Sequence, residues 1–249
     1  MSTADPPLNG DTTGSSPSLV NELDNVVYGS YWRRKHLLSQ PVPAFPVKRW
    51  WRTDGLSEIE RIYFEAVKRS PSVLDVGAGD LSIMRKFESA GYSGEYHTLD
   101  PGEEYTHTYR DLAEVHRTYC AILCLDVIEH LPLQQGVRML TRLTELLEPG
   151  GVMVVQTPNA RCIRYPASWD MTHLHIYNAH DLWAYLSGLG FTVEGFRIVF
   201  GSEYPSMGER IRGLAGAFIA SRLLGCDYAD NIAMIGRKSE HPAGTTSAA

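Results

Sequence analysis

The stretch SVLDVGAGDLS, residues 72–82, joins a short apolar run to two glycines that closely follow a carboxylate. Short apolar runs bounded by turn residues are typical of strands buried in parallel sheets. The segment behind the glycines, LSIMRKFESAG, has a helical pattern and stops at a glycine. A strand, a glycine turn and a helix in this order predict one unit of an open α/β sheet with a ligand at the turn.

Strand and helix patterns alternate through the rest of the chain. Further strand patterns are GEYHTLD (94–100), YCAILCLD (119–126), GVMVVQTP (151–158), FTVEGFRIVF (191–200) and NIAMIG (231–236). Helix patterns lie before and between them, one opened by the capping box Ser57-x-x-Glu60 and another by Asn178. This alternation predicts an α/β fold, a mostly parallel sheet with helices on both faces.

Composition limits the class of protein. The 249 residues are 43% hydrophobic and have a formal net charge of -6. The basic residues are spread out, which makes nucleic acid an unexpected partner, because phosphate binding needs a clustered basic face. The 4 cysteines show no CxxC spacing, so we expect reduced thiols. With no signal-peptide pattern and no apolar run of spanning length, we expect a cytoplasmic protein without a membrane span.

The glycine turn fits a dinucleotide fingerprint, a plain tight turn or a pocket for another nucleotide-like cofactor. Gly77 and Gly79 let the backbone turn sharply and bring a ligand against main-chain amides. A dinucleotide fingerprint has a third glycine, where this sequence has Ser82. Asp80 stands where a pyrophosphate would lie, and its carboxylate would repel phosphate. A ligand with an ammonium or sulfonium group fits the turn better.

A second carboxylate, Asp100, ends the next strand. A carboxylate at that place accepts hydrogen bonds from the two hydroxyls of a ribose. The chain therefore offers an anion for a cationic amino-acid end, a glycine turn and an anion for a ribose. This combination is the chemical outline of S-adenosylmethionine.

From about Val73 to Phe200 the chain resembles the class I S-adenosylmethionine-dependent methyltransferases. VLDVGAGDLS is similar to their first motif, TLD to the acidic end of the second strand, LCLDVIEHLP to the fourth strand and LLEPGGVMVVQTPN to the fifth. THLHIYNAHDLWAYLSGLGF resembles a branch acting on small molecules, many of them sugars or secondary metabolites. The resemblance implies a Rossmann-like, seven-stranded sheet. The cofactor-binding residues that it implies are Asp75, Gly77, Ala78, Gly79, Asp100, Asp111, Leu112, Leu125 and Asp126.

One part of the chain departs from this family pattern. Ten residues separate Asp100 from Asp111, which the resemblance places near the adenine. A full crossover helix with its loops takes about 10–12 residues. Either the second helix of the family is reduced to a turn, or the strand THTYR (106–110) is displaced.

The resemblance also divides the chain. Residues 56–238 form the expected methyltransferase domain, and residues 1–18 and 239–249 are expected to be disordered tails. Residues 19–55 mix basic and aromatic side chains with prolines. We interpret them as a cap over the pocket, although KRWWR (48–52) would also suit RNA. The insertion 201–230 carries an apolar stripe and small residues, so a lid helix, a homodimer helix and ordinary packing on the sheet all stay open.

Two groups of side chains are candidates for the chemistry of methyl transfer. Transfer to a hydroxyl requires a base. DVIEH places Asp126, Glu129 and His130 behind the fourth strand of the family, and MTHLHIY places His173 and His175 beyond the fifth. In an extended segment both histidines would point to one face. We predict His173 or His175 as the base, with Asp126 orienting one of them. His173 is preferred because Asp170 lies three residues before it.

A metal-dependent reaction is the alternative. Asp126, Glu129, His130 and His173 resemble the magnesium set of methyltransferases that modify quinone precursors and small-RNA ends. Oxygen and imidazole ligands suit magnesium or manganese. A non-catalytic methyltransferase-like subunit is a further alternative, which the intact glycine turn disfavours. The sequence favours S-adenosylmethionine-dependent O-methylation of a small-molecule acceptor, a sugar or sugar-containing metabolite.

Overall fold

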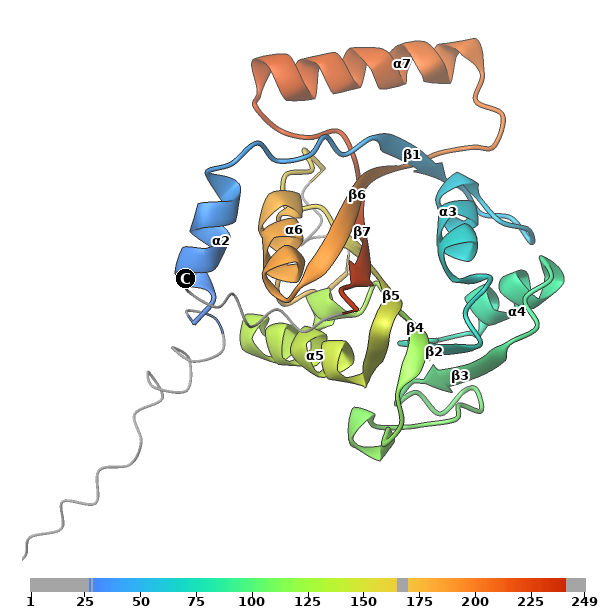
Figure 1. Cartoon of the computed structure of the whole chain (residues 1–249). Helices are drawn as coiled ribbons and strands as arrows, with labels where there is room; N and C mark the ends of the chain where they lie inside the picture. Colours follow the sequence, from blue (N-terminus) through green and yellow to red (C-terminus); the bar gives the residue numbers. More distant parts are fainter. Residues whose placement is uncertain (1–26, 28, 165–169, 241–249) are drawn as a thin grey trace, which may run out of the picture.

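The computed structural model describes residues 27, 29–164 and 170–240, and these form a seven-stranded sheet flanked by helices (Figure 1). The predicted tail 1–18, the first part of the predicted cap and residues 241–249 of the second tail lie outside the described residues. The strands are β1 (Val47–Trp50), β2 (Ser72–Val76), β3 (Glu95–Leu99), β4 (Tyr119–Leu125), β5 (Leu147–Pro158), β6 (Phe191–Phe200) and β7 (Asn231–Lys238). Their spatial order is β1-β6-β7-β5-β4-β2-β3.

The sheet is mostly parallel, as predicted. β7 runs antiparallel to β5 and β6, and the other neighbouring strands pair in parallel. The carboxyl ends of β2, β4 and β5 therefore meet at one edge, where ligands bind in open α/β sheets. The expectation of a Rossmann-like α/β fold is confirmed.

Helices cover both faces of the sheet: α2 (Tyr31–Leu38), α3 (Glu58–Val67), α4 (Ser82–Ser89), α5 (Leu133–Leu146) and α6 (Ala179–Gly188). A further helix, α7 (Met207–Phe218), follows β6. Alternate residues of β2 show how the two cores are separated: Leu74 packs with the cluster of α5 and α6, and Val73 with the cluster of α3 and α4. This alternation follows from the pleat of a strand.

The segment before α3 adds an edge strand to the sheet. β1 begins directly after Pro46 and pairs in parallel with β6, from Val47 opposite Arg197 to Trp50 opposite Phe200. Phe45 is buried, and its ring occupies the place where a Cβ on Gly195 would lie, since that atom would be 2.4 Å from Phe45 Cδ1. The described part of the 19–55 segment is thus built into the fold.

The short connection between β3 and β4 contains no full crossover helix. Tyr109 N–H donates to Thr98 O (3.0 Å), and Asp100 N–H donates to Tyr109 O (3.2 Å), which makes one isolated parallel bridge. A single 3₁₀ turn, η2 (Leu112–Glu114), follows. No helix forms between Asp100 and Asp111, and the THTYR strand is reduced to this bridge.

α7 lies outside the layers of the fold, across the end of β6 and β1 (Figure 1). None of its residues is buried, and the π-helical turn η5 (Ile219–Leu223) continues it. Its large apolar side chains Met207, Ile211, Leu214 and Phe218 are 59–74% exposed. Among the helices of the described residues, none is long and apolar enough to cross a membrane.

If β1 and its approach are part of the core, Phe45→Ala should destabilise the protein by about 3 kcal/mol, because a buried aromatic ring is replaced by a cavity. Trp32, on α2, is 80% exposed. Trp32→Ala should change the free energy of unfolding by less than about 0.5 kcal/mol. Urea unfolding of both variants checks this. Equal stabilities would contradict the role of β1.

Candidate active site

The turn after β2 has a geometry that requires glycine. Gly77 has φ +74° and Gly79 has φ +47°, in the left-handed region. A Cβ on Gly77 would lie 2.3 Å from Val127 Cγ2. The amides of Gly77 and Ala78 both donate to Leu99 O, at 2.8 and 3.3 Å, which ties the turn to β3.

This turn forms one wall of a cavity of about 340 Å³ at the carboxyl edge of the sheet. Six of the residues predicted to bind the cofactor line it: Asp75, Gly77, Ala78, Gly79, Leu125 and Asp126. The lining also includes residues that the sequence analysis did not select: Trp50, Glu60, Tyr63, Asp80, Ser82, Ile83, Lys86, Gln156 and Phe200. The cavity has the size of a small-molecule site.

Asp75 is the buried acid of this cavity. Its side chain is enclosed, and Tyr96 O–H donates to Asp75 Oδ2 at 2.8 Å. Burial raises the pKa of Asp75 to about 7, and the nearby charge of Asp100 adds to the rise, although the Tyr96 hydrogen bond opposes it. A cationic ligand group beside Asp75 would favour the ionised carboxylate.

Asp100 lies at the rim, next to the glycine turn. Gly79 N–H donates to Asp100 Oδ2 (2.9 Å), and Gly102 N–H donates to Oδ1 (2.8 Å). Asp80, one residue before the N-cap Leu81, accepts a hydrogen bond from the N–H of Ser82, the first residue of α4 (2.9 Å). A hydrogen bond with the Ser82 side chain is the first cause of the lowered pKa of Asp80, and the bond from Ser82 N–H lowers that pKa further.

The two residues predicted to lie by the adenine are outside this cavity. Asp111 is exposed and caps η2, accepting from Ala113 N–H at 2.7 Å. Leu112 is half-buried and packs against the hydrophobic core. Their assignment as cofactor contacts stays a prediction.

Asp126 lies at the floor of the cavity, where protein groups hold both of its oxygens. Its side chain is open to the cavity, and its backbone has φ +55°. Gln156 Nε2 donates to Oδ2 (2.6 Å) and Asn231 Nδ2 donates to Oδ1 (2.8 Å). The surrounding protein raises the pKa of Asp126, while these amides and the charges of His130 and His173 lower it.

A carboxylate and two imidazoles gather beside this floor. One ligand atom each of Glu129, His130 and His173 lie within 4.8 Å of one another. The rings of His130 and His173 meet edge to face, with centroids 5.1 Å apart, and Thr172 Oγ1 lies 2.8 Å from His130 Nδ1. Asp126, the fourth predicted metal ligand, is outside the group because it is held by the amides of Gln156 and Asn231.

Glu129 is buried within this group. Thr157 O–H donates to Glu129 Oε2 at 2.9 Å. Burial raises the pKa of Glu129 to about 8, and the charge of Asp126 adds to the rise. A divalent cation would therefore have to displace a proton from Glu129 near neutral pH.

The expectation that both downstream histidines point to one face is wrong. The amides of Leu174 and His175 both donate to Glu129 O, at 2.7 and 3.1 Å, so the segment is not an alternating strand. The ring of His175 packs edge to face on Tyr177, 4.7 Å between centroids, and lines a separate cavity with α5 and α6. Burial lowers the pKa of His175. His173 alone of the pair joins Glu129 and His130.

Residues 49–195, more than half of the chain, match a family model described as "Methyltransferase domain". A SAM-dependent methyltransferase from Archaeoglobus fulgidus has a similar structure, with TM-score 0.55, 19% identity, and coverage of 72% of this chain and 90% of that chain. An O-methyltransferase family protein from Burkholderia thailandensis gives TM-score 0.50 and 11% identity, covering 73% and 55% of the two chains. These likenesses concern the fold. A search of curated proteins found no match.

Asp75 should make stability depend on pH. An unfolded aspartate titrates near 3.9, whereas folding raises the pKa of Asp75 to about 7. Between these values the folded chain keeps a proton that the unfolded chain loses, so the contribution of Asp75 to stability falls as pH rises through this window.

Asp75→Asn cannot ionise, and it should be more stable than wild type by about 2 kcal/mol at pH 8, with a much smaller difference at pH 4. Urea unfolding at the two pH values measures this. Asp54 is exposed and provides a control. The difference in stability between Asp54→Asn and wild type should be the same at both pH values. A pH-independent gain in Asp75→Asn would contradict the raised pKa.

Proposed function

The chain belongs to the methyltransferase-domain family that its residues 49–195 match, and from this membership we propose that it transfers the methyl group of S-adenosylmethionine to a hydroxyl of a sugar or sugar-containing metabolite. One observation carries the cofactor assignment. A glycine turn with two left-handed glycines is flanked by the buried acid Asp75 and the rim acid Asp100.

The acids explain why this cofactor suits the cavity. Asp75 and Asp126 place negative charge at a site for an ammonium and a sulfonium group. Two backbone amides each donate to one oxygen of the Asp100 carboxylate and fix its orientation. The remaining lone pairs of these oxygens can accept hydrogen bonds from ribose hydroxyls. Asp80 accepts from Ser82 N–H and keeps a negative charge where a dinucleotide would need to place phosphate.

His173 is the base in this proposal. When bound, the cofactor supplies an electrophilic methyl group on a sulfonium. The acceptor oxygen forms the new C–O bond as the C–S bond breaks, and its proton passes to the imidazole of His173. Asp126 is close enough for His173 and His130 to lower its pKa, so the developing imidazolium is attracted by the Asp126 carboxylate. The protein otherwise supplies proximity and orientation.

A metal-dependent version of the reaction is the second candidate, favoured by the grouping of Glu129, His130 and His173. Their nitrogen and oxygen atoms would suit manganese or magnesium. EDTA should abolish turnover in this version and have no effect if His173 acts as a base. Glu129→Gln also distinguishes the metal-dependent reaction from base catalysis by His173. It should abolish turnover in the metal-dependent reaction alone, because it removes the carboxylate from the group.

Asp100→Ala should weaken binding of S-adenosylhomocysteine by about 1–3 kcal/mol, because hydrogen bonds from a carboxylate to the ribose are lost. Glu103→Ala removes an exposed acid from the following loop and should leave affinity unchanged. Isothermal titration calorimetry measures both, with NAD as a ligand that should not bind. Tight NAD binding without S-adenosylhomocysteine binding would overturn the proposed cofactor.

His173→Ala should lower kcat by about 10²–10⁴ with little change in cofactor affinity, since general-base catalysis is lost. His175→Ala is the matched control, because its ring packs on Tyr177 in another cavity. Kinetics with the acceptor found by screening sugars and metabolites with labelled cofactor would measure both. Equal rates for His173→Ala and wild type would exclude His173 as the base.

A further inference from the structure

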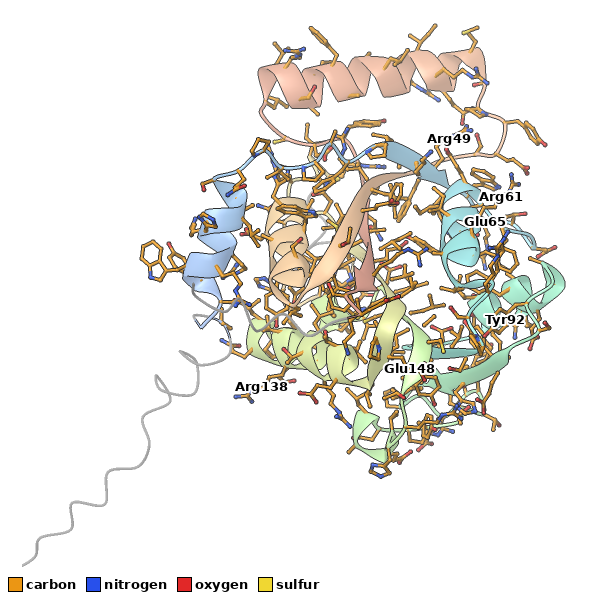
Figure 2. The ribbon with its side chains drawn as sticks, viewed as in Figure 1. Arg49, Arg61, Glu65, Tyr92, Arg138 and Glu148 are labelled. Atoms are coloured by element: carbon orange, nitrogen blue, oxygen red, sulfur yellow. The ribbon has the colours of Figure 1, made fainter. Side chains whose placement is uncertain are left out.

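A second cavity, of about 840 Å³, lies between α7 and the edge of the sheet formed by β1 and β6. Its lining comes from Val47 and Arg49 on β1, Val199 and Phe200 on β6, and the inner side of α7. Arg49, labelled in Figure 2, lies on the side of β1 nearest to α7. The cavity is at the carboxyl end of β6, the same edge of the sheet as the cofactor cavity.

The orientation of α7 preserves this space. Gly213 and Ala217 line the cavity, and a Cβ on Gly216 would lie 2.6 Å from Tyr228 Cε2. Of the large apolar residues of α7, Leu214 lines the cavity although it is 74% exposed, whereas Ile211 and Phe218, 59% and 60% exposed, are outside the lining. A helix that merely packed on the sheet would turn its large side chains inward. Here Gly213 and Ala217 line the cavity beside Leu214, and the other large apolar side chains of α7 lie outside the lining, which leaves room for a ligand.

The walls of this cavity have an excess of positive charge. Its lining includes the arginines Arg49, Arg197, Arg210 and Arg212, and the acids Glu209 and Asp227. Arg197 and Asp227 form an ion pair at 3.3 Å. Glu209 accepts from Ser206 N–H at 2.7 Å and so caps α7. Arg49 forms an ion pair with Glu58 (3.5 Å), outside the lining, so the positive charge that suits an anion comes mainly from Arg210 and Arg212 on α7.

The two cavities share a wall. Phe200, at the end of β6, lines both of them. Its ring lies 5.3 Å from the ring of Trp50, which lines the cofactor cavity. A molecule in the α7 cavity could thus extend past Phe200 toward the cofactor. Aromatic rings at this position also keep water from the boundary between the two sites.

We propose that the cavity under α7 binds the methyl acceptor, and that this acceptor combines an apolar portion with an anionic group such as a carboxylate or phosphate. This inference rests on the proposed function, because it makes the α7 cavity the acceptor half of the same site. Arg212 and its neighbours bind the anion, Val199 and Phe200 contact the apolar portion, and the hydroxyl reaches the cofactor.

Calorimetry on the full chain saturated with S-adenosylhomocysteine tests the site with decanoate, decyl phosphate and neutral decanamide. Both anions should bind, and decanamide should bind at least about tenfold more weakly. Equal binding of decanoate and decanamide would overturn the anionic class. Failure of both anions to bind would overturn the site.

Two pairs of variants locate the probe. Gly213 lines the cavity, and a Cβ on it would have no heavy atom within 4 Å, so Gly213→Leu fills the cavity without a clash. Gly208→Leu is its control, because Gly208 is exposed and outside the lining. Arg212→Ala removes a charge from the wall, and Arg222→Ala removes an exposed one outside it.

Gly213→Leu and Arg212→Ala should each weaken decanoate binding about tenfold, whereas both controls stay within about twofold. Equal decanoate affinity in all variants would place the probe elsewhere, such as the outer face of α7, and would overturn the proposal. S-adenosylhomocysteine affinity should not change in any variant. If wild type fails to bind S-adenosylhomocysteine, the proposed function fails. Titrations of decanoate into wild type and the variants without S-adenosylhomocysteine then still test whether the α7 cavity binds the anion.

Discussion

A hydrogen-bonded chain from Tyr63 through Gln156 to Asp126 and Asn231 holds the site together. An ionised Asp126 only accepts, so Gln156 must turn its NH₂ to it (2.6 Å) and its carbonyl oxygen to Tyr63, whose O–H then donates at 2.7 Å. Asn231 donates to the other oxygen of Asp126 at 2.8 Å. The chain links α3, β5 and β7 to the end of β4. Every partner except Asp126 itself is buried, so loss of one would leave polar groups unpaired.

Two neighbouring cavities of opposite charge lie at the same edge of the sheet. The cofactor cavity brings Asp75 and Asp126 together with Asp100 at its rim, and burial raises the pKa of Asp75 to about 7. The cavity under α7 has arginines in excess on its walls. A cationic ligand relieves the repulsion in the first, and an anionic ligand relieves it in the second. A chain of net charge -6 thereby has a local basic pocket.

Local patterns predicted most elements but not the contacts made by distant segments. The glycine turn, the cap of α6 at Asn178 and the strand patterns depend on nearby residues, which is why they were predictable. β1 depends on pairing with β6, about 150 residues away. Tyr63 lay on an apolar helix face and looked like core. Gln156, a polar residue inside the apolar run VMVVQTP, was a usable signal for a site residue.

The residues proposed for the chemistry of methyl transfer lie inside the family match, whereas α7, which covers the proposed acceptor cavity, lies outside it. The matched residues 49–195 contain the glycine turn, Asp126 and the histidine group. α7 begins at Met207, beyond that range, and β1 lies at its very start. A fold that supplies one reaction commonly gains its specificity from segments added around it. Since Phe200 lines both cavities, the end of β6 is where the cofactor cavity inside the matched range meets the proposed acceptor cavity.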